Sequence, residues 1–183
     1  MEIILVRHGE ADYSEVDDKG YLGFGRDLAP LTTRGVEQAN AVSQDNLLAN
    51  ADIIISSPYT RALHTAAIIS KNLNLSLMVD IGFHERLPDT KNELQTREDF
   101  QNSFKEYDFF KGIYADDKSH YWESIEQQID RIKHSLNKYV KYEKIVIVTH
   151  GELIRRFASV RLPFCGLAHI IKYDKDFRFL GWS

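Results

Sequence analysis

The sequence predicts an α/β protein of three layers, α/β/α, in which helices cover both faces of a mostly parallel central sheet. Three short aliphatic runs, at residues 3–6, 53–55 and 145–148, are bounded by polar residues. Continuous apolar runs of this length are typical of strands buried on both faces of a parallel sheet. Helical patterns occupy the segments between the runs, and such alternation favours a layered α/β domain.

Local signals place the next elements. A fourth strand is predicted near residues 75–79. A helix is expected from Thr33 to Leu48, where a cap-like threonine precedes spaced apolar residues. A second helix is expected from Tyr59 to Leu73, because the preceding Pro58 favours a helix start.

The C-terminal third contains the clearest periodicity. Apolar residues with i, i+3, i+4, i+7 spacing predict a helix from about Trp122 to Val140. From His169 to Trp182, apolar and polar residues alternate around Asp174-Lys175-Asp176. This tail is predicted to form a hairpin at one edge of the sheet.

The chain length of 183 residues fits a single domain spanning residues 1–183, with an insertion at about 86–121. The insertion contains a predicted helix from Thr96 to Phe110 and many aromatic residues. Long excursions in α/β domains often act as lids. The simpler alternative, which we favour, is that these rings pack the extra helix onto the sheet.

Composition excludes several classes of protein. The net charge is −4 and Lys and Arg are not clustered, which argues against nucleic-acid binding. Cys165 is the only cysteine, so an internal disulfide and a multi-thiolate metal site are excluded, and its apolar surroundings predict a buried thiol. The apolar run after Met1-Glu2 is too short for an export signal, and no segment reaches membrane-spanning length. A cytoplasmic protein is expected, with no prediction of its oligomeric state.

Two of the predicted strands end in similar tetrapeptides, Arg7-His8-Gly9-Glu10 and Thr149-His150-Gly151-Glu152. In an open parallel sheet, ligands bind outside the carboxyl ends of the strands. The third aliphatic run ends at residues 56–58 and leads to Arg61 in the first turn of a helix. One rim of the sheet is therefore predicted to bring together two histidines and two arginines.

These residue types suit phosphoryl chemistry. Arginine donates paired hydrogen bonds to phosphate oxygens and stays charged, and two arginines offset the charge of a phosphoryl transition state. A neutral imidazole is a competent nucleophile for phosphorus, and neighbouring cations favour its neutral form. Gly9 and Gly151 would let backbone N–H groups approach an anion closely.

At this point the sequence resembles the histidine phosphatase superfamily, also called phosphoglycerate mutase-like, whose signature is Arg-His-Gly. The similarity covers roughly residues 1 to 160. Further matching features, in the same order and spacing, are Leu31-Thr32-x-x-Gly35 with Gln38-Ala39, Ser56-Ser57-Pro58-x-x-Arg61-Ala62-x-x-Thr65-Ala66, Glu85 shortly after a strand, and Val148-Thr149-His150-Gly151.

The resemblance implies a role for each matching position. His8 corresponds to the histidine that becomes phosphorylated, and Arg7, Arg61 and His150 correspond to the phosphate pocket. Glu85 corresponds to the acid that protonates the leaving oxygen and later takes a proton from water, a role that requires a carboxyl able to hold a proton near neutral pH. The implied activity is hydrolysis of phosphate monoesters through a phosphohistidine, without metal or other cofactor. The implied partner is a small phosphorylated substrate or a phosphoprotein.

The chain also departs from the family pattern. Glu152 stands where many members have a second glycine, residues 11–14 lack the usual asparagine, and residues 86–89 lack the usual Phe-Gly turn. Specificity is therefore expected to depend on residues 86–121 and on the loop at 11–29. This loop is acidic, and if it covers the site it would disfavour substrates with additional negative charge. Its acidic residues include Asp12, Glu15, Asp17 and Asp18.

Three alternatives remain open. The first is a phosphoglycerate mutase-type transfer, which the modest chain length disfavours. The second is a metallohydrolase with His8, His150 and Glu85 as ligands, which the adjacent arginines disfavour. The third is a phosphate-binding module without catalysis. Of the neighbouring residues, Glu10 and Glu152 are expected to be solvated or structural, and His84 is expected to be an exposed loop histidine.

Overall fold

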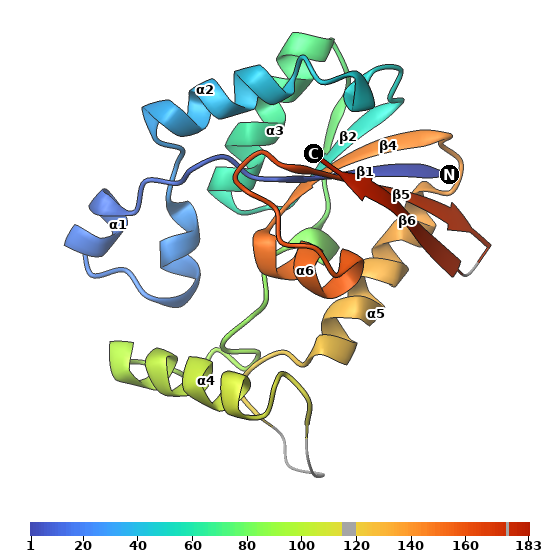
Figure 1. Ribbon diagram of the computed structural model, residues 1–183. Coiled ribbons are helices and arrows are strands. Elements are labelled where there is room, and N and C mark those ends of the chain that lie inside the picture. Colours follow the sequence, from blue (N-terminus) through green and yellow to red (C-terminus); the bar gives the residue numbers. More distant parts are fainter. Residues whose placement is uncertain (115–119, 175) are drawn as a thin grey trace.

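The computed structural model describes residues 1–114, 120–174 and 176–183 (Figure 1). Its centre is a six-stranded sheet with the strand order β3-β2-β4-β1-β5-β6. The strands are β1 (Glu2–Arg7), β2 (Ile53–Ser56), β3 (Leu77–Val79), β4 (Lys144–Thr149), β5 (Leu167–Tyr173) and β6 (Asp176–Trp182). Strands β1 to β4 are parallel, whereas β5 is antiparallel to both of its neighbours. The predicted α/β class with a mostly parallel sheet is confirmed.

Helices connect the strands and surround the sheet. The α-helices are α1 (Ser14–Asp18), α2 (Thr33–Val42), α3 (Thr60–Leu73), α4 (Arg97–Phe109), α5 (Ile125–Leu136) and α6 (Gly151–Ala158). The short 3-10 helices are η1 (Gly23–Leu28), η2 (Asn46–Leu48), η3 (Ile81–Phe83) and η4 (Asn137–Tyr139).

The helix boundaries differ from the predicted ones where capping decides them. Thr32 caps α2 by accepting a hydrogen bond from the backbone N–H of Gly35, and α2 ends at Val42, so the helix predicted to reach Leu48 is two separate pieces. Helix α5 begins only after Ser124, whose side chain forms a capping box with Gln127. Trp122 is buried but precedes this helix.

Alternating residues of the strands face opposite layers, which confirms the three-layer arrangement. On one face, Ile3 and Leu5 of β1 pack in a cluster with residues of α5 and α6. On the other face, Ile4 and Val6 pack in a cluster with residues of α3. The sheet is therefore buried on both sides, which explains why its central strands are continuously aliphatic.

The register of the parallel strands places the motif residues at one edge. Arg7 of β1 is level with Thr149 of β4, and the His8 N–H continues the ladder by donating to the Thr149 carbonyl over 2.9 Å. On the other side of β4, the Ser57 N–H donates to the Val148 carbonyl over 2.9 Å. The ends of β1, β4 and β2 therefore form one continuous rim.

The segment from 86 to 121 leaves the sheet and forms α4, which lies beyond the carboxyl-terminal edge, as α1 also does (Figure 1). The prediction that aromatic rings pack this extra helix onto the sheet is wrong, because α4 lies beyond the sheet edge, and its rings differ in burial. Tyr107 is buried against Trp122, with ring centroids 5.2 Å apart, whereas Phe109 is 80% exposed. Residues 115–119 of the proposed insertion lie outside the described residues.

The predicted C-terminal hairpin is present, because β5 and β6 pair antiparallel with β6 at the sheet edge. Of its predicted turn, Asp174 and Asp176 are described, and Lys175 lies outside the described residues. No helix in the described part of the chain has the length and apolar character needed to cross a membrane.

Candidate active site

His8 and His150 meet at the rim because β1 and β4 are neighbours in the sheet. Their ring centroids are 5.2 Å apart and the rings lie edge to face. His8 is 7% exposed and His150 is fully buried. The convergence of the two imidazoles that the sequence predicts is therefore present.

A backbone contact fixes the tautomer of His8. The Nδ1 atom lies 2.7 Å from the carbonyl oxygen of Gly9. A carbonyl oxygen can only accept, so Nδ1 carries the proton and Nε2 keeps its lone pair in the neutral ring. Burial, with a further contribution from the charges of Arg61 and Arg7, lowers the pKa of His8 to about 3. His8 is consequently neutral at physiological pH and has a free lone pair on Nε2.

A hydrogen bond to Ser57, at the end of the neighbouring strand β2, holds His150 in place. The Nε2 of His150 lies 2.7 Å from the hydroxyl oxygen of Ser57. Burial and the nearby His8 and Arg61 lower the pKa of His150 well below its ordinary value. Its Nδ1 is buried and has no hydrogen-bond partner in residues 1–114, 120–174 and 176–183.

Arg61 lies in the first turn of α3 and is 5% exposed. Its Nη1 donates to the Asp27 Oδ1 over 2.9 Å, and its Nε is without a hydrogen-bond partner in the described part of the chain. Asp27 belongs to η1, and sequence reasoning did not identify it. The arginine is thus fixed at one end and keeps donor capacity at the other.

Arg7 completes the cationic side of the rim. Its Nη1 donates to the carbonyl oxygen of Leu162 over 2.7 Å, and its Cζ lies 4.2 Å from the ring centroid of Phe164. A Cβ atom on Gly151 would lie 3.1 Å from the Arg7 Nε. Glycine at 151 therefore gives the guanidinium room beside α6.

The role predicted for Gly9 needs correction. Its N–H was expected to be available to an anion, but it donates to the hydroxyl oxygen of Thr65 over 3.0 Å. A Cβ atom at Gly9 would lie 2.6 Å from the carbonyl oxygen of Gly35, which is closer than real Cβ contacts. Glycine is required here because the chain after β1 packs directly against the start of α2.

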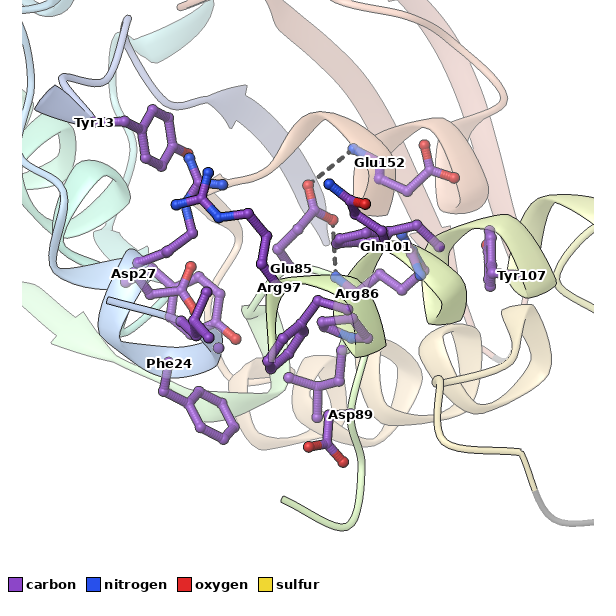
Figure 2. A pocket seen from close by; sticks show the side chains of 18 of the residues that line it. Tyr13, Phe24, Asp27, Glu85, Arg86, Asp89, Arg97, Gln101, Tyr107 and Glu152 are labelled. Atoms are coloured by element: carbon purple, nitrogen blue, oxygen red, sulfur yellow. Dashed lines mark hydrogen bonds between the residues drawn. The ribbon is translucent and has the colours of Figure 1, made fainter. Parts of the chain in front are cut away.

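Glu85 lies at the N-terminus of α6 (Figure 2). Its carboxylate accepts hydrogen bonds from the backbone N–H groups of Arg86 at 2.9 Å, Glu152 at 3.2 Å and Leu153 at 3.2 Å. Burial raises the pKa of the Glu85 carboxyl, although these hydrogen bonds and the charge of Arg61 act in the opposite direction. The net effect is a Glu85 carboxyl whose pKa lies above its ordinary value.

The expectation for His84 was wrong, because this residue is buried. Its Nδ1 lies 2.6 Å from the carbonyl oxygen of Glu85, and its ring stacks on Tyr59 with centroids 6.1 Å apart. Burial lowers the pKa of His84 below its ordinary value. The position directly after η3 turns the side chain inward, which sequence pattern alone does not indicate.

A cavity of about 440 Å³ opens above this rim and reaches Arg61 and Glu85 (Figure 2). Its walls come from the loop at 11–29, from residues after Glu85 and from α4, which are the segments on which specificity is expected to depend. Of the acidic residues of this loop, Asp27 lines the cavity, whereas Asp12, Glu15, Asp17 and Asp18 do not. Asp17 pairs with Arg26 at 3.2 Å, and Asp12 bonds Ser14. The loop residues that line the cavity include Tyr13, Phe24, Arg26 and Asp27.

Other candidate groups have structural contacts. The Glu152 carboxylate pairs with Arg155 and Arg156, at 2.6 and 2.7 Å. Glu10 accepts from the Thr32 hydroxyl over 3.1 Å. Cys165 is half-buried rather than fully buried, and burial raises the pKa of its thiol to about 12. Within the described residues, no three His, Cys, Asp or Glu side chains are grouped so that they could hold a metal ion.

Comparison with known proteins identifies the class of this fold, which is that of the phosphoglycerate mutase-like phosphatases. The family model of the histidine phosphatase superfamily (branch 1) matches residues 3–165, and the chain belongs to that superfamily.

Individual relatives agree with this class. A Hydrogenobacter thermophilus protein named "Putative phosphoserine phosphatase 2" is 32% identical over 180 residues, which cover 95% of this chain and 84% of that protein. The 2,3-bisphosphoglycerate-dependent phosphoglycerate mutase of Haemophilus ducreyi is 30% identical over 90% of this chain and 71% of its own. The solved structure of a mycobacterial glucosyl-3-phosphoglycerate phosphatase with VO3 has a TM-score of 0.74 at 18% identity, covering 100% of this chain and 98% of that chain, and supports the fold. Phosphatase activity, as the sequence predicts, is consistent with the family and with these names.

Proposed function

We propose that this chain hydrolyses small phosphate monoesters through a phosphohistidine intermediate on His8, without a metal ion. One observation carries the proposal. The buried, neutral His8 has its Nδ1 engaged by a carbonyl oxygen, and its Nε2 is therefore the atom with a lone pair, beside two arginines. A neutral ring nitrogen in a cationic environment is suited to attack a phosphate monoester.

The first step is transfer of the phosphoryl group. The Nε2 of His8 attacks phosphorus, the bond to the ester oxygen breaks, and the phosphoryl group moves to the imidazole. Arg7 and Arg61 stabilise the charge on the equatorial oxygens, and the donor capacity left at each Nε is available for this purpose. His150, which directly follows β4, supports the same oxygens.

The second requirement is a proton donor for the leaving oxygen. Glu85 meets it, because burial raises the pKa of its carboxyl and the residue lines the cavity above the rim. In the next step water attacks the phosphorus of phosphohistidine, the bond between phosphorus and the His8 Nε2 breaks, and inorganic phosphate leaves. The Glu85 carboxylate takes a proton from the attacking water, and this transfer regenerates the acid. Both proton transfers are therefore assigned to Glu85, which is a carboxylic acid before the first step and a carboxylate before the second.

The test is His8→Ala with p-nitrophenyl phosphate as substrate, and His134→Ala, exposed on α5, as the matched control. The His8 variant is expected to lose turnover by at least about 10³-fold while its circular dichroism spectrum is unchanged. The control and a chelator-treated sample are expected to keep full activity. Undiminished turnover in the His8 variant, or loss of activity on chelation, would contradict the proposal.

The mutase reaction is the second candidate, favoured by the similarity to the Haemophilus ducreyi enzyme. It shares the phosphohistidine step and differs in the acceptor, which is a phosphoglycerate instead of water. Priming with 2,3-bisphosphoglycerate and following the interconversion of 2- and 3-phosphoglycerate separates the two. Release of inorganic phosphate without interconversion supports the hydrolase. Tight phosphate binding with neither reaction would identify a binding module.

A further inference from the structure

A largely buried ion pair outside the cavity holds the chain segment that carries Glu85. Glu123 is 5% exposed and lies just before α5, and Arg131 belongs to that helix. The Arg131 Nε donates to the Glu123 Oε1 over 2.5 Å, and its Nη2 donates to the Glu123 Oε2 over 3.0 Å. Two parallel hydrogen bonds of this kind fix the plane of the guanidinium.

The ion pair also binds the main chain around Glu85. The Arg131 Nη1 donates to the carbonyl oxygen of Gly82 over 2.7 Å, and its Nη2 donates to that of Glu85 over 3.4 Å. Glu123 binds Leu87, because its Oε2 accepts from the Leu87 N–H over 3.3 Å and its own N–H donates to the Leu87 carbonyl oxygen over 2.9 Å. The pair therefore contacts the backbone before, at and after the proposed proton donor.

Helix α5 also fixes the start of this segment. The Ser135 hydroxyl donates to the Asp80 Oδ1 over 3.1 Å, directly before η3. A Cβ atom on Gly82 would overlap the Ser135 side chain, so η3 packs directly against α5. The backbone that leads to Glu85 consequently follows α5 from one contact to the next.

Neither member of the ion pair is placed to touch a substrate. Among the described residues, those that line the cavity above the rim do not include Glu123 or Arg131. Each side-chain nitrogen of Arg131 donates to an acceptor within the protein. A buried ion pair adds little stability compared with apolar side chains of similar volume. What this pair supplies beyond such packing is a set of directional hydrogen bonds to the main chain at Glu85.

Glu85 is thereby held at two points. Its carbonyl oxygen lies 2.6 Å from the His84 Nδ1 and 3.4 Å from the Arg131 Nη2. Its carboxylate accepts from the N–H groups of Glu152 and Leu153 at the start of α6. The place of the carboxyl group depends on both attachments, and misplacing a reacting group by about 1 Å costs up to about 10²-fold in rate.

Resting on the proton-donor role proposed above for Glu85, we propose that Glu123 and Arg131 are positioning residues that place the Glu85 carboxyl at the leaving oxygen. Arg131 fixes the backbone at Glu85, and Glu123 keeps the guanidinium in its plane. Loss of this arrangement impairs proton transfer to the leaving oxygen. It leaves the attack of the His8 Nε2 on phosphorus unchanged, because the pair does not contact the rim histidines.

The test is Arg131→Lys, which keeps the charge but lacks the planar fork that reaches Glu123 and both carbonyl oxygens at once. Values of kcat/KM are measured for p-nitrophenyl phosphate, phenyl phosphate and ethyl phosphate, whose leaving oxygens need a proton to an increasing degree. The loss should be about 10- to 100-fold on ethyl phosphate and less than about threefold on p-nitrophenyl phosphate. Lys133→Met, exposed on the same helix, is the matched control and should change none of these values.

A double-mutant cycle shows whether Arg131 acts through Glu85. In the Glu85→Gln background, Arg131→Lys should cause no further loss on ethyl phosphate, because the proton donor is already absent. Two losses that multiply would overturn the proposal, and so would an equal loss on all three esters, which indicates a general effect on folding. If Arg131→Lys does not fold, the same measurements use Arg131→Met combined with Glu123→Gln, which leaves no unpaired charge and keeps an oxygen for the Leu87 N–H.

A separate measurement distinguishes this proposal from the phosphatase function. Wild-type protein that hydrolyses none of the esters would contradict the proposed function, and a Glu85→Gln variant that loses equally on all of them would contradict the proton-donor role. In either case, titration of the Glu85 carboxyl still reports on its position, by NMR of the labelled carboxyl carbon with Glu85→Gln for assignment. A titration that shifts in Arg131→Lys but not in Lys133→Met supports the positioning, and one identical to wild type in both variants refutes it.

Discussion

Arg61 of the sheet rim and residues of the α4 segment line the same cavity, but the two regions are built differently. At the rim, His8, His150 and Arg61 are buried, and each is fixed by a hydrogen bond to the backbone or to another side chain. On α4, Arg97 and Phe104 are exposed, and only Ser103 and Tyr107 are buried. The groups proposed to react are therefore held rigidly, whereas the groups expected to select the substrate stand on a partly solvated helix.

This difference separates catalysis from specificity. Buried rim residues have altered proton affinities because water is excluded from around them. Exposed α4 residues can change with little effect on stability, since surface substitutions usually matter little. We therefore expect rim substitutions to affect all substrates equally and α4 substitutions to affect some substrates more than others. That residues 86–121 close over the site as a lid, within a single domain, remains a prediction.

The largest expected effect is that of removing the Arg61 side chain from the rim. Arg61→Ala removes a donor proposed to stabilise the transition state, and kcat/KM should fall by about 10³-fold for every phosphate ester. It also leaves Asp27 without its ion-pair partner, so the free energy of unfolding should fall by about 3 kcal/mol. Kinetics on several esters and urea denaturation measure the two effects.

A double variant separates these two effects. Arg61→Ala combined with Asp27→Asn removes the unpaired charge and should recover most of the stability without recovering activity. Recovery of activity would show that Arg61 acts by folding the loop at η1 and not by binding phosphate. In that case Arg61, like the residues of α4, would not take part in the chemical step itself.

The second effect concerns the proton donor. Glu85→Gln cannot protonate a leaving oxygen, so kcat/KM for an alkyl phosphate should fall by about 10²-fold, while p-nitrophenyl phosphate, whose leaving group needs no proton, should lose much less. Because the pKa of Glu85 is raised and its protonated form is the active one, the wild-type rate on alkyl phosphates should decrease as pH rises through that pKa. The variant should lack this decrease. Equal losses on both esters at every pH would remove Glu85 from the role.

Sequence reasoning predicted the rim well, for identifiable physical reasons. The aliphatic runs forced buried parallel strands, and His8 and His150 directly follow two of them, so strand adjacency was enough to bring the rings together. Arg61 followed from a helix start after Pro58. None of these inferences needed side-chain conformations.

The rest depended on contacts between residues far apart in the sequence. Asp27 pairs with Arg61 across 34 positions, and the Thr65 hydroxyl that accepts from Gly9 is 56 positions away. The inward turn of His84 comes from local backbone geometry after η3. Such contacts have no periodic signal, so the sequence indicated the groups proposed to react but not the contacts that support them.

The smallest effect is the pH dependence of stability that the buried rim should produce. His8 has its pKa lowered from 6.5 to about 3, so the unfolded chain binds a proton that the folded protein does not, and stability falls as pH drops below 6.5. Between pH 7 and pH 5 this residue alone should reduce the free energy of unfolding by about 2 kcal/mol. His8→Gln should remove that part of the decline, whereas His134→Gln, exposed on α5, should not. Urea denaturation at the two pH values measures the difference, and an identical decline in wild type and His8→Gln would mean that His8 is solvated like a surface residue.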